Sequence, residues 1–209
     1  MAAKQKYFDL SGSSVDLTAT NQWTIIQPSL NYITQGTGDQ QRVGDVVCGK
    51  KLQLRFEVWG GTHETTTAGA LPHPQQIRIL VIVDKDAGQT QTSLITDLLS
   101  ADQATAFNNM DNTSRFRTLM DEVVQFDNMQ HNETAANKFK VQQGLKYIER
   151  YIQLDMPICF KKDEATPTAP ETILQNNIVV LAAPMQTIGA VDNPWVQLRS
   201  RIRFDDVKR

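Results

Sequence analysis

The sequence predicts a single all-β domain, folded as a sandwich or a barrel. Short extended segments recur along the chain and are separated by clusters of Gly, Pro, Asn, Asp and Thr. Neither a repeat with a period of about 20–50 residues nor a long low-complexity linker divides it. A chain of 209 residues can bury a sizeable core as one domain.

Composition narrows the functional class. Hydrophobic residues make 40% of the chain and charged residues 21%, which is ordinary for a globular protein. The longest apolar runs, Ile79–Val83 and Ile178–Ala183, are far shorter than the roughly 20 residues of a membrane span. The first six residues hold no apolar stretch, so we expect no secretory signal peptide, and two cysteines do not make a disulfide framework.

Uncharged polar residues are abundant: Thr, Gln and Asn together make 51 of the 209 residues. Such side chains offer hydrogen bonds without charge repulsion, which suits surfaces that pack against copies of themselves. Compositional drift explains the same numbers equally well. The net charge is −2, but residues 195–209 carry +3, so an anionic partner would contact this C-terminal segment.

The first half of the chain has two clear strands. Ser14–Gln27 is a weaker strand candidate, whereas Lys51–Trp59 alternates strictly between apolar and polar residues, as expected for a sheet with one wet face. Gly60–Pro74 is rich in Thr, Gly and Pro and is predicted to be a long exposed loop. Ile77–Val83 is apolar at every position but Arg78, which predicts a central strand covered on both faces.

The second half mixes clear and ambiguous segments. Leu94–Leu99 has the spacing of a short helix, with Thr92 or Ser93 as its N-cap. The apolar residues of 116–124 fit helical spacing slightly better than strand alternation. Tyr147–Pro157 alternates except at Arg150. After a loop over residues 163–171, two further strands are predicted over Ile178–Ala183 and residues 196–204.

The last of these strands carries the strongest candidate site. Arg199, Arg201 and Arg203 alternate with apolar residues, so their side chains would project from one face about 6.6–6.8 Å apart. Three guanidinium groups repel one another unless anions or carboxylates lie opposite. An anionic partner such as nucleic acid and an ion pair with neighbouring strands are both open at this point.

Other candidate chemistry is sparse. Asp84 and Asp86, followed by Gly88, are a weak candidate for a calcium site, although a simple turn explains them better. The three histidines are scattered, and the chain has no Cys-x-x-Cys pair, nucleophile elbow or phosphate-binding loop, so we expect no enzyme. The cysteines are predicted to be small buried hydrophobes. Core or interface packing is favoured over sugar stacking for the three tryptophans, Trp23, Trp59 and Trp195.

Three segments in sequence order suggest a family. Residues 41–47, running into Lys51–Arg55, resemble the second main strand of single jelly-roll coat proteins. Residues 77–99 look like the strand, acidic turn and short helix that follow in those proteins. Arg115, Phe116, Leu119 and Asp121 match their Arg-Phe-x-x-Leu-x-Asp strand. The chain thus resembles the capsid proteins of satellite tobacco necrosis virus and of geminivirus- and circovirus-like small circular single-stranded DNA viruses.

The resemblance implies an eight-stranded antiparallel jelly roll of two four-stranded sheets with one short helix, spanning residues 1–209. It implies that residues 115–126 form a strand, against the local helical spacing. The implied function is that of a viral capsid protein without catalysis or cofactor. Many copies, 60 in a T=1 icosahedral shell, would self-assemble inside the host cell into a virion around a single-stranded genome.

The amino terminus departs from the family pattern. Relatives of this kind carry an arginine- and lysine-rich arm that reaches the packaged nucleic acid, whereas this segment has only Lys4 and Lys6. We therefore assign the nucleic-acid contact to Arg199, Arg201 and Arg203 together with these two lysines. The alternative is a jelly-roll module that binds a carbohydrate or a receptor through Trp59, Trp23 and the Thr62–Ala70 loop. A cupin-type enzyme would need a histidine cluster that the chain lacks.

Overall fold

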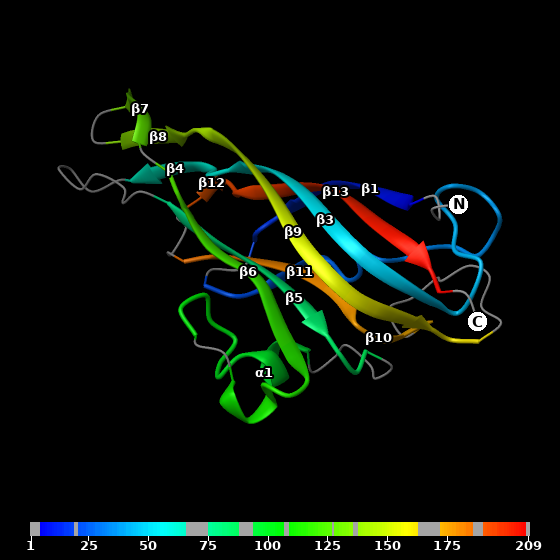
Figure 1. The fold of residues 1–209 in the computed structure, drawn as a ribbon. Coiled ribbons are helices and arrows are strands. Elements are labelled where there is room, and N and C mark those ends of the chain that lie inside the picture. Colours follow the sequence, from blue (N-terminus) through cyan, green and yellow to red (C-terminus); the bar gives the residue numbers. More distant parts are fainter. Residues whose placement is uncertain are drawn as a thin grey trace.

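The fold is a sandwich of antiparallel sheets (Figure 1). The structure is a computed structural model that describes residues 5–18, 21–65, 75–87, 94–106, 109–126, 128–135, 138–162, 172–185 and 190–207. Thr92, Ser93 and Lys4, for which the sequence predicts a helix cap and a nucleic-acid contact, lie outside the described residues.

Two main sheets face each other. The first has the order β1-β13-β3-β9-β10, with bounds Lys6–Asp16, Trp195–Asp206, Val46–Trp59, Leu145–Phe160 and Ile173–Gln175. The second has the order β2-β11-β5-β6, with bounds Thr24–Gln27, Asn177–Pro184, Gln76–Asp84 and Phe116–Gln125. A smaller sheet at one end of the sandwich has the order β12-β4-β8-β7, with bounds Ala190–Asp192, Thr62–Thr65, Lys138–Gln143 and Asn128–Ala135.

The strand order identifies the topology. When the eight strands β1, β2, β3, β5, β6, β9, β11 and β13 are counted along the chain, the sheets read 1-8-3-6 and 2-7-4-5. Within each sheet, first pairs with eighth, second with seventh, third with sixth and fourth with fifth. A ribbon of four strands folded back on four others and then rolled up gives this pairing, which is the jelly roll. The predicted fold class is therefore confirmed, with β10 and the small sheet added to it.

Alternating side chains build the core between the sheets. Leu52, Leu54, Phe56 and Val58 of β3 point inward and are all buried, while the intervening polar residues point outward. The odd-numbered residues of β5 from Ile77 to Val83 meet them from the opposite sheet. Strict alternation on β3 and β13 therefore leaves the outer face of the first sheet polar.

The second sheet is covered on its outer face as well. The even-numbered residues Leu80 and Ile82 of β5 pack against Trp23 and against α1 (Leu94–Leu98), forming a second hydrophobic cluster with Phe116. Figure 1 shows α1 beneath β5 and β6, on the side away from β3 and β9. Because both faces of β5 are covered, apolar residues occupy odd- and even-numbered positions of this strand, as the sequence predicted. The two sheets thus differ: among the described residues, one outer face is covered and no element packs on the other.

β6 shows why local spacing misled. The segment is a strand, as the family resemblance implied and the helical spacing did not. Val81 of β5 pairs with Met120 and Ile82 pairs with Thr118, so Leu119 is the extra residue of a β-bulge. The bulge changes which residues face the core: Phe116 belongs to the outer cluster, whereas Met120 and Val124 belong to the inner one. Because the bulge reverses which positions of β6 face the core, the apolar residues of this strand fall at the spacing of a helix.

Two other expectations need correction, and one hairpin was not expected. The predicted loop Gly60–Pro74 begins with the strand β4, and its residues 66–74 lie outside the described part of the chain. The weak candidate Ser14–Gln27 contains the end of β1 and all of β2, which lie in different sheets. The β7–β8 hairpin was not predicted, because its mostly polar sequence offers only the short alternation of Phe139 and Val141.

Arg150, which interrupts the alternation of β9, points to the edge where the two main sheets meet. Its guanidinium donates to both carboxylate oxygens of Glu122 on β6, with Nε–Oε1 and Nη2–Oε2 distances of 2.5 and 2.6 Å. The arginine on the core side of β9 is therefore a bridge between the sheets.

Candidate nucleic-acid interface

The bare face of the first sheet carries the predicted arginine ladder. Along β13 the even-numbered residues from Val196 to Phe204 are buried, whereas Arg199, Arg201 and Arg203 are exposed. The prediction that the three arginines share one wet face is thus confirmed by the burial pattern. The neighbouring strands β1 and β3 decide what these arginines meet.

Pairing register sets the arginines against other cations. Arg199 lies directly opposite Arg55 on β3, and Arg203 lies opposite Lys51. Between these two rows, Arg201 lies opposite the uncharged Gln53. Like charges directly opposite one another on an antiparallel pair are destabilising, so two of the three rows carry an electrostatic cost in the isolated subunit.

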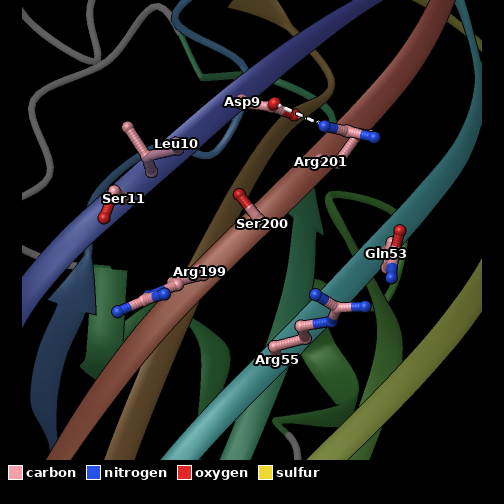
Figure 2. Close-up of a pocket in the computed structure, with 8 residues that line it drawn as sticks. All are labelled: Asp9, Leu10, Ser11, Gln53, Arg55, Arg199, Ser200 and Arg201. Carbon is pink, nitrogen blue, oxygen red and sulfur yellow. Dashed lines mark hydrogen bonds and ion pairs between the residues drawn. The ribbon is translucent and has the colours of Figure 1, made fainter.

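Carboxylates of the flanking strands neutralise one cation in each of two rows. Asp9 of β1 accepts two hydrogen bonds from Arg201, at 2.6 and 2.7 Å, and the guanidinium lowers the pKa of this carboxyl (Figure 2). Glu149 of β9 accepts from Nε of Arg55 at 2.7 Å. Its pKa falls to about 2, chiefly through Arg55 and further through Gln53 and the Tyr151 hydroxyl.

Three cations remain without such a partner. Within the part of the chain that the structure describes, Arg199, Arg203 and Lys51 make no ion pair. The four rows from Lys51 to Glu57 hold five cations and three carboxylates. The cations are Lys51, Arg55, Arg199, Arg201 and Arg203, and the carboxylates are Asp9, Glu57 and Glu149. These four rows are therefore positive by two, although the whole chain is negative by two; the next row, which holds Trp59 and Trp195, adds the carboxylate of Asp16. Arg201 thus pairs with a neighbouring strand, whereas contact of Arg199 and Arg203 with an anion stays a prediction.

Aromatic side chains border the cations along β9. Tyr147 and Tyr151 are 72% and 71% exposed, the highest fractions among the large hydrophobic side chains described. The Tyr151 hydroxyl donates to Glu149 at 3.0 Å and accepts from Gln53 at 3.0 Å. At the far end of the face, Trp59 and Trp195 stand opposite each other with ring centroids 6.4 Å apart.

The face is hollowed along its length. A depression of about 390 Å³ lies between β1, β13 and β3, lined by Asp9, Arg55, Arg199 and Arg201 among others (Figure 2). A second of about 390 Å³ and a third of about 360 Å³ lie towards β9, beside Tyr151 and Tyr147 respectively. Open, polar hollows of this kind suit an extended, charged ligand better than an enclosed small molecule.

The predicted residues outside this face have structural roles. Lys6 lies on β1, where its ammonium group pairs with Asp206 at 2.7 Å and donates to the Gln41 carbonyl. The structure thus places this lysine in an intramolecular ion pair, at the end of the ladder strand.

Asp84 and the Arg-Phe-x-x-Leu-x-Asp strand belong together. Arg115 donates to both oxygens of the buried Asp84 at 3.0 and 2.9 Å and reaches Asp97 of α1 at 2.9 Å. Asp84 Oδ1 also accepts the backbone N–H of Asp86. Asp84 is therefore an ion-pair acceptor that holds α1 to the sheet, and the described residues contain no group of three potential metal ligands here or elsewhere.

Asp121, the last residue of that motif, anchors the same layer. Its carboxylate takes two hydrogen bonds from Arg78, at 2.7 and 2.6 Å. The other arm of Arg78 donates to the carbonyls of Ala104 and Ala106, in the loop that covers the second sheet. Arg115 and Asp121 thus each form an ion pair that holds the covering layer, one at each end of the covered stretch. The sequence did not reveal this role.

Two further expectations can be placed. Trp23 is 6% exposed and donates its indole N–H to the Gln103 carbonyl at 2.9 Å, so it belongs to the second cluster and offers no ring face to a sugar. Cys48 and Cys159 are half-buried free thiols, and burial raises the pKa of Cys159. Over the described residues, no helix is long and apolar enough to span a membrane.

Comparison with known proteins gives weak likenesses. Among solved structures, the chain is similar to the BFDV capsid protein, solved as a 60-mer, with 11% identity, a TM-score of 0.35 and coverage of 100% of this chain and 97% of that one. It is similar to VP1 of Trichodysplasia spinulosa-associated polyomavirus with 9% identity, a TM-score of 0.15 and coverage of 98% and 74%. At these values neither likeness carries an argument. No family model matches the sequence, and no curated protein does.

Proposed function

We propose that this protein is a viral capsid subunit, which self-assembles into an icosahedral shell around a single-stranded genome. The observation that carries the proposal is the contrast between the two sheets of the jelly roll. One outer face is sealed by α1 and the loop around Ala104, whereas no described element packs on the other, whose four rows from Lys51 to Glu57 hold two more cations than carboxylates on an acidic chain. A subunit that encloses nucleic acid needs one such face towards its cargo.

The fold suits a permanent assembly. A jelly roll buries its central strands between two sheets and leaves loops and short strands at the ends of the sandwich, where copies can pack. The uncharged polar composition gives hydrogen-bonding surface that does not repel its own copy. Weak contacts suffice, because closure makes the several contacts of each subunit act together. The T=1 shell of 60 copies and assembly inside the host cell follow from the resemblance of the motifs.

Particle imaging tests the assembly. The full chain is expressed, purified and examined by electron microscopy and sedimentation velocity over a range of salt and pH. We expect closed particles of uniform size. A chain that stays a monomer at micromolar concentration in every condition would overturn the proposal.

The cargo face is tested within the particles. Arg199→Glu with Arg203→Glu changes two cations that make no ion pair among the described residues, so folding should survive. We expect particles with a lower 260/280 nm absorbance ratio than those of the wild type. Arg117→Glu with Lys161→Glu, two exposed cations away from this face, makes the same change in charge and should leave the ratio unchanged. Equal ratios in the two double variants would remove the role of the ladder.

A further inference from the structure

The exposed tyrosines of β9 alternate with the cation rows. The Lys51–Arg203 row and the Arg55–Arg199 row are separated by the row that ends in Tyr151, in which Asp9 neutralises Arg201. Tyr147 ends the row beyond the Arg55–Arg199 row. Cation rows and tyrosines therefore recur with the same spacing of four residues, about 13–14 Å along the sheet. A stretched nucleotide step is about twice the 3.4 Å rise of the stacked duplex, so this spacing corresponds to about two nucleotides.

The two tyrosines are presented as flat, open rings. Each is more than two-thirds exposed, although a tyrosine ring is largely apolar. The Tyr151 hydroxyl is held by Glu149 and Gln53, so its orientation is set before any ligand arrives and less entropy is lost on binding. Glu149 does not repel an anion as a free carboxylate would, because Arg55 and Gln53 donate to it.

We infer that Tyr147 and Tyr151 are stacking positions for nucleobases, and that they make this face selective for single-stranded nucleic acid over duplex. The inference rests on the proposed function of the face and assigns it a ligand geometry. Phosphates lie against the cation rows of β3 and β13, and every second base stacks on a tyrosine of β9. A duplex satisfies only the first half of this arrangement, because its base faces are already stacked inside the helix.

Three fluorescein-labelled probes of equal length separate the two contributions: oligothymidylate, an abasic single strand and a duplex. Binding to the full chain is followed by anisotropy. The wild type should bind oligothymidylate more tightly than either of the others. Tyr147→Ala with Tyr151→Ala should weaken oligothymidylate binding by about 5-fold or more per tyrosine and leave the abasic strand and the duplex unchanged.

Conservative and distant variants serve as controls. Tyr147→Phe with Tyr151→Phe keeps both rings and should keep the preference for bases. Val123→Ala truncates another exposed apolar side chain outside this face and should change nothing. The slope of affinity against salt should be the same in the alanine variant as in the wild type, because no charge has been removed, whereas Arg199→Glu with Arg203→Glu should reduce it.

The outcomes distinguish this inference from the proposed function. If the alanine variant keeps the preference for thymidylate over the abasic strand, or if the wild type has no such preference, base stacking on these tyrosines is refuted even where particles form. If the preference depends on the tyrosines but no particles form, stacking stands and the capsid role fails.

Discussion

Replacing Asp84 with alanine should detach the layer that covers the second sheet. Asp84 is 3% exposed at the end of β5, and both its oxygens accept from the guanidinium of Arg115, at 3.0 and 2.9 Å. The substitution leaves a partly buried guanidinium whose remaining acidic partner is Asp97 of α1. It also removes the acceptor of the Asp86 backbone N–H, which shapes the turn after β5.

The expected loss of stability follows from burial. Breaking a buried ion pair by removing one partner costs about 3–5 kcal/mol. The Arg115 side chain is 20% exposed and keeps Asp97, so we expect about 2–3 kcal/mol here. For a chain of this size that corresponds to a fall in Tm of roughly 4–12 °C. Asp97→Ala removes the more exposed partner and should cost about 1 kcal/mol or less.

Urea unfolding of the full chain measures this difference. Trp23 lies in the cluster that α1 covers, so in a background of Trp59→Phe with Trp195→Phe its fluorescence reports this layer, while far-ultraviolet circular dichroism reports the sheets. A loss below about 0.5 kcal/mol for Asp84→Ala would refute the assigned role, because changes of that size are typical of ordinary surface positions. Millimolar calcium should leave the wild-type unfolding curve unchanged. A calcium-dependent rise that Asp84→Ala abolishes would instead make this carboxylate a metal ligand.

Two other predictions concern Arg42 and Glu149. Arg42→Met should lower the free energy of unfolding by about 3 kcal/mol or more, as measured by urea unfolding. The substitution removes a fully buried guanidinium that donates hydrogen bonds to the carbonyls of Ile33 and Gly44. The Glu149 carboxyl should titrate near pH 2 by carbon-detected NMR. In Arg55→Ala its pKa should rise, although the hydrogen bonds from Gln53 and the Tyr151 hydroxyl remain and still lower it. Because the folded-state pKa is lowered, the stabilising interaction is complete above the ordinary pKa and is lost as pH falls through about 2. An Arg55→Ala titration that stays near 2 would contradict the assigned cause.

Alternation and continuous apolar runs made the central strands predictable. Four predicted segments lie within strands: Lys51–Trp59, Ile77–Val83, Ile178–Ala183 and residues 196–204. A half-buried strand alternates apolar and polar residues, and a strand buried on both faces is apolar almost throughout, so residue types indicate the environment of each strand. The bulge at Leu119 and the inter-sheet bridge at Arg150 broke that rule. Each is a response to a partner strand, which a local window of sequence does not contain.

For the same reason, the sequence predicted the arginines of the candidate site but not their partners. Arginines at every second position of a strand share a face, so the ladder could be read from the chain directly. Their neighbours could not, since Asp9 reaches Arg201 across 192 positions of sequence and Glu149 reaches Arg55 across 94. The exposed tyrosines of β9 were missed because an exposed aromatic and a buried one look alike in a sequence.

The order of residues alone determined that this chain is an all-β sandwich or barrel with a basic final strand, because side-chain alternation and charge are local properties. Tertiary structure decided which cations are neutralised, which sheet is covered, and why Arg115 and Asp121 stand six positions apart. Those outcomes depend on strand order and register, which bring distant segments together. The same strands could have paired in other orders and registers, and each residue would then have had other neighbours.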